Sequence, residues 1–200
     1  MGSIRLAVAG DAAAVAGVCR PFGDSTVISF ETEPPDERQM RGRILETLET
    51  YPWLVCECDG AVVGYAYATK HRVRAAYRWS VDTAVYIDAA HHRRGIGRGL
   101  YASLCTILAR QGYVNAYAGI TLPNPASVGL HEAVGFQPVG VYRQVGHKLG
   151  AWHDVGWWQL ALRERSREPE EPTPLSVMAA RSDWPALVSL GQSMIRARVG

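Results

Sequence analysis

A stretch rich in glycine and arginine constrains the fold of this 200-residue chain more than any other feature. It reads HRRGIGRGL from His92 to Leu100, between a strand-like segment and a segment with apolar residues at helical spacing. Glycine has no Cβ, so backbone N–H groups at the start of a helix can converge there on phosphate oxygens. Each arginine at a helix start opposes the helix dipole by about 0.3–1 kcal/mol. Three arginines in this position suggest a bound polyanion, and a surface loop with three solvated side chains is an equally weighted alternative.

The spacing of these glycines argues against two common phosphate-binding loops. Leu100 stands where G-x-G-x-x-G requires its last glycine, and no G-x-x-x-x-G-K-[ST] sequence occurs. A dinucleotide-binding loop and an ATP-binding P-loop are therefore both disfavoured.

The pattern of apolar residues predicts a mixed α+β domain. Strands are expected at 4–8, 53–58, 61–69, 79–87 and 114–122, with a closing pair of strands in 136–162. Four helices are expected, at 11–19, at 36–50, from the glycine-rich stretch to 112, and at 126–134. Pro21 should end the first of them. Because strands and helices do not alternate strictly, an α+β arrangement is favoured over a doubly wound sheet.

The composition changes after residue 162. Residues 1–162 form the predicted domain, and 163–174 (RERSREPEEPTP) read as a charged, proline-rich linker. Residues 175–200 predict an amphipathic tail with one helix from Asp183 to Met194. The alternative is a truncated repeat of the N-terminus, since Ala7, Asp11 and Ala14 recur at a spacing of 172.

Composition bounds the class of protein. Hydrophobic residues make up 48% of the chain, which is enough for a core, and 21 basic against 19 acidic residues argue against a nucleic-acid-coating surface. No apolar run could span a membrane, and residues 1–20 lack a signal sequence, so a cytoplasmic location is expected. No metal is expected, because the histidines and cysteines lack metal-ligand spacing. The four cysteines are predicted to be buried or half-buried free thiols: Cys19, Cys56, Cys58 and Cys105.

Asp82 is an acidic residue inside an apolar strand. Alternation over 80–87 places Val81, Val85 and Ile87 on one face and Asp82 with Tyr86 on the other. An acid in this setting lies either at a hydrogen-bonded rim or at a working site.

Together these segments resemble the GCN5-related N-acetyltransferases, and within them the phosphinothricin and methionine sulfoximine N-acetyltransferases. The resemblance covers about residues 3–162. The family's [QR]-x-x-G-x-[GA] loop matches His92 to Gly97, with histidine first, and again Arg94 to Gly99. The other matching segments are 30–35 (FETEPP), 66–68 before 72–79, 122–127 (LPNPAS), 130–132 (LHE), 135–136, 146–148 (GHK) and 152–156 (WHDVG).

The resemblance implies a fold and an acetyl-CoA site. The implied GNAT fold has a mostly antiparallel twisted sheet, a splayed parallel strand pair and helices on both faces. Val85, Tyr86 and Ile87 would offer backbone groups to the pantetheine arm, and Asn124 would contact acetyl-CoA further along. The residues implied to hold the pyrophosphate are Arg93, Arg94, Gly95, Ile96, Gly97 and Arg98.

The resemblance also implies catalytic residues. N-acetyl transfer needs a neutral amine, so the ammonium must lose a proton. The matching residues are Asp82 and His131. The family commonly has Glu where Asp82 stands, and the shorter side chain favours transfer through water. His131 is a base, an acid, the partner of Asp82, or a histidine satisfied in the core.

The implied acceptor is a small amino-acid analogue such as phosphinothricin, methionine sulfoximine or methionine sulfone, acetylated on its α-amino group by direct transfer. Arginines suit its anionic groups, because a guanidinium binds them bidentately. Each arginine taken singly is more often a solvated surface group. The candidate residues are Phe30, Glu31, Arg72, Arg74, Tyr77 and Arg78, with Glu31 placed for the substrate ammonium. Alternatives are another small amine, an ordinary amino acid or a peptide N-terminus as acceptor, and a non-catalytic acyl-CoA-binding module. The family usually forms homodimers, so a homodimer is expected.

Overall fold

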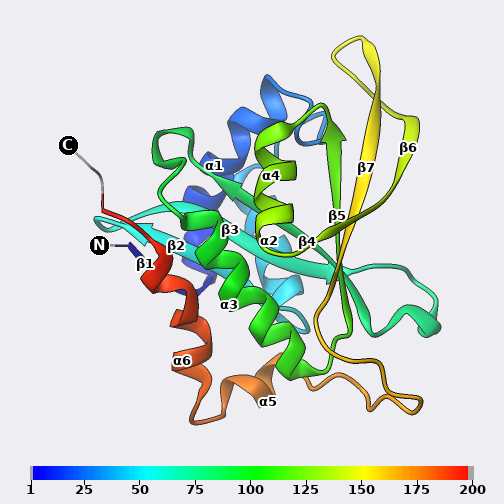
Figure 1. Ribbon diagram of the computed structural model, residues 1–200. Helices are drawn as coiled ribbons and strands as arrows, with labels where there is room; N and C mark the ends of the chain where they lie inside the picture. The colour runs from blue at the N-terminus through cyan, green and yellow to red at the C-terminus, as the bar shows by residue number, and fades with distance from the viewer. Residues whose placement is uncertain (1, 198–200) are drawn as a thin grey trace.

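Seven strands form one sheet in the computed structural model, which describes residues 2–197 (Figure 1). The strand order is β1-β2-β3-β4-β5-β7-β6. Only the β4–β5 pairing is parallel, and the other neighbours run antiparallel. This confirms the predicted α+β sheet with one parallel pair. The strands are β1 Gly2–Leu6, β2 Trp53–Cys58, β3 Ala61–Lys70, β4 Ser80–Ile87, β5 Asn115–Leu122, β6 Gln137–Lys148 and β7 Ala151–Ala161.

Helices cover both faces of the sheet. On one face, α1 (Ala12–Asp24) and α2 (Glu37–Leu48) bury a core with Val15, Ile44 and Trp53. On the other, α3 (Ile96–Gln111) buries a larger core with residues such as Leu104, and α4 (Pro125–Ala133) lies beside it (Figure 1). Short 3₁₀ turns are η1 Ala9–Asp11, η2 Ala75–Tyr77, η3 Ala89–His91 and η4 Leu190–Met194.

Local sequence signals account for most of these boundaries. Asp59 and Gly60 both have positive φ, which makes the tight turn between β2 and β3. Asp36 and Gln39 form a capping box at the start of α2. Gly112, at φ 105°, ends α3 in the left-handed conformation.

The first helix differs from the prediction at both ends. α1 continues through Pro21 to Asp24. Proline removes one hydrogen bond, to the residue four positions earlier, and that residue is the exposed Gly17, whose carbonyl can bind water. Asp11 precedes α1, but its carboxylate accepts two 2.7 Å hydrogen bonds from Arg5 instead of capping the helix.

The C-terminal segment packs onto the main core. It forms α5 (Leu175–Ala179), α6 (Trp184–Ser189) and η4, so the expected single helix is broken after Ser189 and ends as a 3₁₀ turn. A truncated repeat of the N-terminus would begin with a strand, where the structure has α5. Met178, Leu187 and Val188 are buried in the same core as α3. Within the predicted linker, the Thr173 amide donates to the Gln111 carbonyl over 2.6 Å.

The structure can be compared with three expectations, on membrane-spanning helices, metal-ligand clusters and the cysteines. Among residues 2–197, no helix combines the length and apolar character needed to cross a membrane. The same residues contain no cluster of three or more side chains suited to a metal ion. All four cysteines are free thiols, three of them buried and Cys105 half-buried, as predicted. Burial raises the pKa of Cys105 to about 12, so this thiol stays protonated.

Candidate active site

The site is centred on the point where β4 and β5 stop pairing. The parallel register runs through three pairs and ends at Asp82 with Tyr117. Just beyond, the Thr83 hydroxyl donates to the Tyr117 carbonyl over 3.1 Å. From Thr83 to Ile87, β4 keeps its pairing with β3 only. One edge of this segment is therefore available to hydrogen-bond a ligand that lies along it as an added strand would.

Asp82 is half-buried at this junction and pairs with a histidine. The His71 Nδ1 donates to Oδ1 of Asp82 over 2.6 Å, and the Arg72 guanidinium lies 4.0 Å from the other carboxylate oxygen. Burial raises the pKa of Asp82 above its ordinary value, although the hydrogen bond from His71 opposes that shift. The His71 ring stacks on Tyr117 with a centroid distance of 4.3 Å, which fixes its plane. The pair is thus a preorganised acceptor for a proton.

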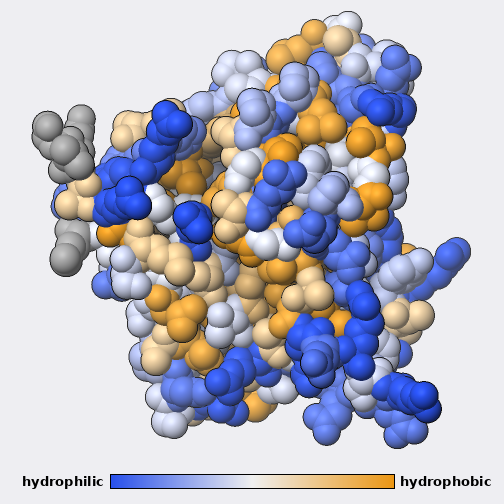
Figure 2. Space-filling view, in the orientation of Figure 1, coloured by the Kyte–Doolittle hydropathy of each residue, from blue (hydrophilic) through white to orange (hydrophobic). Residues whose placement is uncertain are grey.

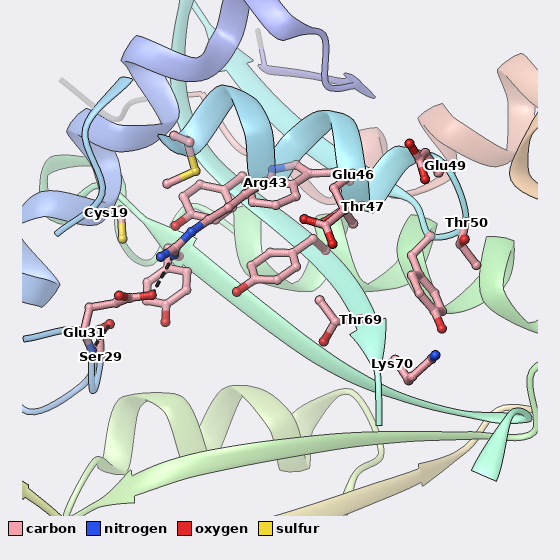
Figure 3. Close-up of a pocket in the computed structure, with 16 residues that line it drawn as sticks. Cys19, Ser29, Glu31, Arg43, Glu46, Thr47, Glu49, Thr50, Thr69 and Lys70 are labelled. Atoms are coloured by element: carbon pink, nitrogen blue, oxygen red, sulfur yellow. Dashed lines mark hydrogen bonds and ion pairs between the residues drawn. The ribbon is translucent and has the colours of Figure 1, made fainter. Parts of the chain in front are cut away.

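A cavity of about 720 Å³ opens on the α1–α2 side of the sheet (Figure 3). We call it the acceptor-side cavity, and its wall includes Tyr65, Tyr67, Thr69 and Tyr86. Thr69 pairs directly with Asp82 across β3 and β4, so the two side chains lie on the same face of the sheet. Asp82 therefore lies beside the Thr69 end of this cavity.

An ion pair lies at the other end of the acceptor-side cavity. Figure 3 shows Arg43 reaching from α2 toward Glu31, and their atoms are 2.6 Å apart. Between the ion pair and Thr69 the wall is aromatic, with Trp53 stacked on Tyr67 at 4.3 Å. The Tyr86 hydroxyl stays protonated, because burial raises its pKa to about 12. The cavity therefore has an aromatic wall between Thr69 and the Glu31–Arg43 pair, and Glu46, Glu49 and Lys70 also line it.

A second cavity, of about 1010 Å³, lies on the α3–α4 side of the sheet. We call it the loop-side cavity. Ile87, the start of α3 and the start of α4 line it, together with Arg93 and Arg98. Figure 2 shows hydrophilic residues gathered over the start of α3, beside an apolar depression that leads toward α4. The first amides of α3 have no partner within the helix, so they can bind an anion.

His131 lies in the core between α3 and α4, with only 4% of its surface exposed. Its Nδ1 lies 2.7 Å from the Ser127 carbonyl, which can only accept, so Nδ1 carries the hydrogen. Its Nε2 then accepts from the Tyr101 hydroxyl over 2.8 Å. Burial lowers the pKa of His131, which keeps the ring neutral near pH 7. Both ring nitrogens are satisfied by groups other than Asp82.

Comparison with known proteins agrees with this geometry. A model of the acetyltransferase (GNAT) domain matches residues 25–157. The phosphinothricin N-acetyltransferase of Streptomyces viridochromogenes is 40% identical over 171 residues, covering 86% of this chain and 90% of that protein. The chain belongs to the GNAT acetyltransferase family.

Two further relatives support the assignment as an N-acetyltransferase. The L-methionine sulfoximine/L-methionine sulfone acetyltransferase of Salmonella typhimurium is 39% identical over 116 residues, covering 58% of this chain and 68% of that protein. The crystal structure of a phosphinothricin acetyltransferase from Sinorhizobium meliloti in complex with AcCoA superposes with a TM-score of 0.81. Its sequence is 33% identical, and the match covers 85% of this chain and 94% of that one.

Most of the loop residues predicted for this GNAT domain line the loop-side cavity. They are Ile87, Arg93, Gly95, Ile96, Gly97 and Arg98. Val85 packs against the larger core and Tyr86 lines the acceptor-side cavity. Arg94 instead turns toward the C-terminal segment, where its Nε donates to the Arg196 carbonyl. The Asn124 side chain caps α4 by accepting from the Ser127 amide over 3.1 Å.

The predicted substrate residues fall into separate places. Glu31 lines the acceptor-side cavity, whereas Phe30 lies against Gly146 of β6. Tyr77 lies edge-on to the His71 ring, near Asp82 and Arg72. Arg78 and Arg74 do not pair with Asp82: Arg78 pairs with Glu171 and lies over Trp79, and Arg74 precedes the η2 turn.

Sequence reasoning missed His71 and Arg43. His71 directly precedes Arg72, which was considered, but its pairing with Asp82 depends on the β3–β4 register. That register could not be counted, because the connection between the strands is long and irregular. Arg43 is one of several charged residues on the polar face of α2, and only the position of the Glu31 loop distinguishes it from the others.

Proposed function

We propose that this chain transfers the acetyl group of acetyl-CoA to the α-amino group of a small amino-acid analogue such as phosphinothricin, methionine sulfoximine or methionine sulfone. The observation that carries the proposal is the position of Asp82 at the end of the paired part of β4 and β5, with a cavity on each face of β4. The names of the relatives in Streptomyces and Salmonella supply the acceptor class.

Acetyl-CoA fits the loop-side cavity. The edge of β4 from Val85 to Ile87 can hydrogen-bond the pantetheine amides. The amides at the start of α3 and the arginines Arg93 and Arg98 suit the pyrophosphate, because both supply positive charge at one place. Asn124 is the N-cap of α4 and directly precedes Pro125, which lines this cavity, so a contact of Asn124 with acetyl-CoA remains part of the proposal.

The acceptor fits the cavity on the opposite face of β4. Arg43 suits the acidic groups of a free amino acid, so the amine of the acceptor would point along the cavity toward Thr69 and Asp82. Glu31 lies at the Arg43 end, so in this arrangement it would not hold the reacting amine, although the sequence suggested that role. Binding would replace the present ion pair of Arg43 with a pair to the substrate. The aromatic wall would cover the apolar part of the acceptor, and Asp82 would lie beyond Thr69.

The transfer then follows from the positions of the groups. Asp82, held by His71, takes a proton from the ammonium through a water molecule. The amine lone pair attacks the acetyl carbonyl carbon, a C–N bond forms and the thioester C–S bond breaks. N–H groups on the free edge of β4 stabilise the oxyanion. CoA leaves as the thiolate, and the proton that the new amide nitrogen loses goes to the CoA sulfur, which gives the neutral amide and the free thiol. We assign His131 no proton transfer, because its nitrogens are engaged by Tyr101 and Ser127.

We also propose that the protein forms a homodimer through the β6–β7 hairpin. The hairpin projects from the sheet (Figure 1), and β6 is an edge strand of it. Its exposed apolar side chains include Val145 and Trp152, which are 51% and 62% exposed. A second copy would cover these side chains and the edge of β6.

Release of free thiol from acetyl-CoA tests the proposed reaction. The acceptors are phosphinothricin, methionine sulfoximine and methionine sulfone, with plain amino acids and no acceptor as controls. We expect rapid release with the three analogues and little with the controls. Acetyl-CoA binding without thiol release on any of the analogues would contradict the proposed acceptor class.

A further inference from the structure

The last described residues of the chain lie in close contact with the start of α3. A Cβ added at Gly191 of η4 would overlap the Gly99 carbonyl, and one at Gly95 would overlap the Met194 carbonyl. The Gly191 amide also donates to the buried Ser103 hydroxyl over 3.0 Å. Glycines of the phosphate-binding loop thus also allow the backbone of the tail to approach it.

A pair of hydrogen bonds holds Arg196 beside the loop. Its amide donates to the Arg94 carbonyl over 2.9 Å, and Nε of Arg94 donates back to the Arg196 carbonyl over 3.2 Å. These bonds engage the backbone of Arg196 and leave its side chain exposed. Both Arg196 and Ser193 line the loop-side cavity, together with Arg93 and Arg98. The tail therefore forms one wall of this cavity, and the start of α3 forms another.

In the described part of the chain, the charged side chains that line this cavity are all positive. Among residues 2–197, those that line it include three arginines and no acidic residue. Arg93, Arg98 and Arg196 also have no ion pair within that part of the chain. Neighbouring cations without counter-charges repel one another, so the arrangement suits a ligand with several negative charges.

CoA carries such charges at two places. The pyrophosphate can occupy the start of α3, where the helix amides converge, with Arg93 and Arg98 beside it. The 3′-phosphate on the ribose is a separate group, so it calls for a further cation in the same cavity. Arg196 can supply that cation, because its backbone is hydrogen-bonded to Arg94 just before α3 and the residue itself lines the cavity.

We propose that the C-terminal segment completes the cosubstrate site, with Arg196 and Ser193 binding the 3′-phosphate of acetyl-CoA. This inference rests on the proposed use of acetyl-CoA and assigns a ligand to a segment outside the predicted domain. Arg196 is exposed, so replacing its side chain leaves the packing of the tail unchanged.

Calorimetric binding of CoA and of 3′-dephospho-CoA to the full chain tests the assignment. We expect Arg196→Gln to weaken CoA binding about tenfold, since a charge-assisted hydrogen bond to phosphate is lost. Binding of 3′-dephospho-CoA should change by less than about twofold, because that ligand lacks the group that Arg196 holds.

The matched control is Arg181→Gln, an arginine of the same tail that pairs with Asp183. It should bind both ligands as the unchanged protein does. Equal affinity of Arg196→Gln and the unchanged protein for CoA would overturn the inference, and so would an equal loss for both ligands. Failure of the unchanged chain to bind CoA at all would instead overturn the proposed function.

Discussion

At the scale of single residues, the environment of each titratable group separates the two predicted catalytic side chains. Asp82 is half-buried, bonded to His71 and placed beside a cavity, so it can exchange a proton with a bound ligand. His131 is buried and bonded at both nitrogens, so it supports the packing of Tyr101. The two residues that the sequence suggested for one chemical task therefore lie in different environments, and only that of Asp82 suits the proposed proton transfer.

Asp82→Asn should lower kcat by about 10²- to 10³-fold, because the amide cannot take the amine proton. The affinity for acetyl-CoA should stay unchanged, since the Asp82 side chain lies on the opposite face of β4 from the loop-side cavity. Steady-state kinetics and a cofactor titration measure both. Asp183→Asn, in the tail, is the matched control.

The pH profile gives a second readout of the same residue. Asp82 acts as a base only when ionised, so activity should fall as the pH drops through its pKa. Burial raises that pKa above the ordinary value, so the acid limb should begin at a higher pH than for an exposed aspartate. An acid limb that is unchanged in Asp82→Asn would contradict the assignment.

At the scale of elements, a buried lysine connects the loop that carries Glu31 to the edge strand β6. Nζ of Lys148 in β6 donates to the Gly23 carbonyl over 2.6 Å and to the Ser29 carbonyl over 2.7 Å. These bonds fix the end of α1 and the loop that carries Glu31. A residue about 120 positions away in the sequence thereby holds Ser29, which lines the acceptor-side cavity.

Lys148→Met keeps the aliphatic volume but leaves two buried carbonyls without donors. We expect a loss of about 1–3 kcal/mol in the free energy of unfolding and a rise in KM for the acceptor, with KM for acetyl-CoA unchanged. Denaturant unfolding and kinetics with each substrate varied measure these quantities. Arg143→Met, an exposed cation on the same strand, should change neither. A loss of stability without a change in acceptor KM would show that Lys148 does not position the loop.

At the scale of the whole molecule, the two faces of the sheet carry different cavities. The α1–α2 face encloses the acceptor-side cavity, and the α3 face carries the loop-side cavity and the docked tail. The β6–β7 hairpin leaves the body of the molecule and exposes apolar side chains that α3 and the other helices do not cover (Figure 1).

Light scattering after size-exclusion chromatography tests the proposed dimer. The unchanged protein should elute with the mass of two chains, and Trp152→Lys should shift it toward one chain, because a charge would be buried in the interface. Val177→Lys, at an exposed apolar residue of α5, is the control and should remain a dimer. A single-chain mass for the unchanged protein would refute the arrangement.

The sequence by itself determined features that depend on local backbone chemistry. The turn at Asp59 and Gly60, the alternation around Asp82 and the glycine-rich start of α3 all follow from φ preferences and from the period of the side chains. These are short-range effects, so a few neighbouring residues suffice to predict them. The α+β class follows in turn from the order of the elements.

Only the tertiary structure decided which distant residues meet. His71 reaches Asp82 through the β3–β4 register, and Arg43 reaches Glu31 because α2 packs beside the loop after α1. Arg196 lies 102 residues from Arg94 and meets it only because the tail docks on α3. Such contacts depend on packing of the whole core, which no local pattern of residues encodes.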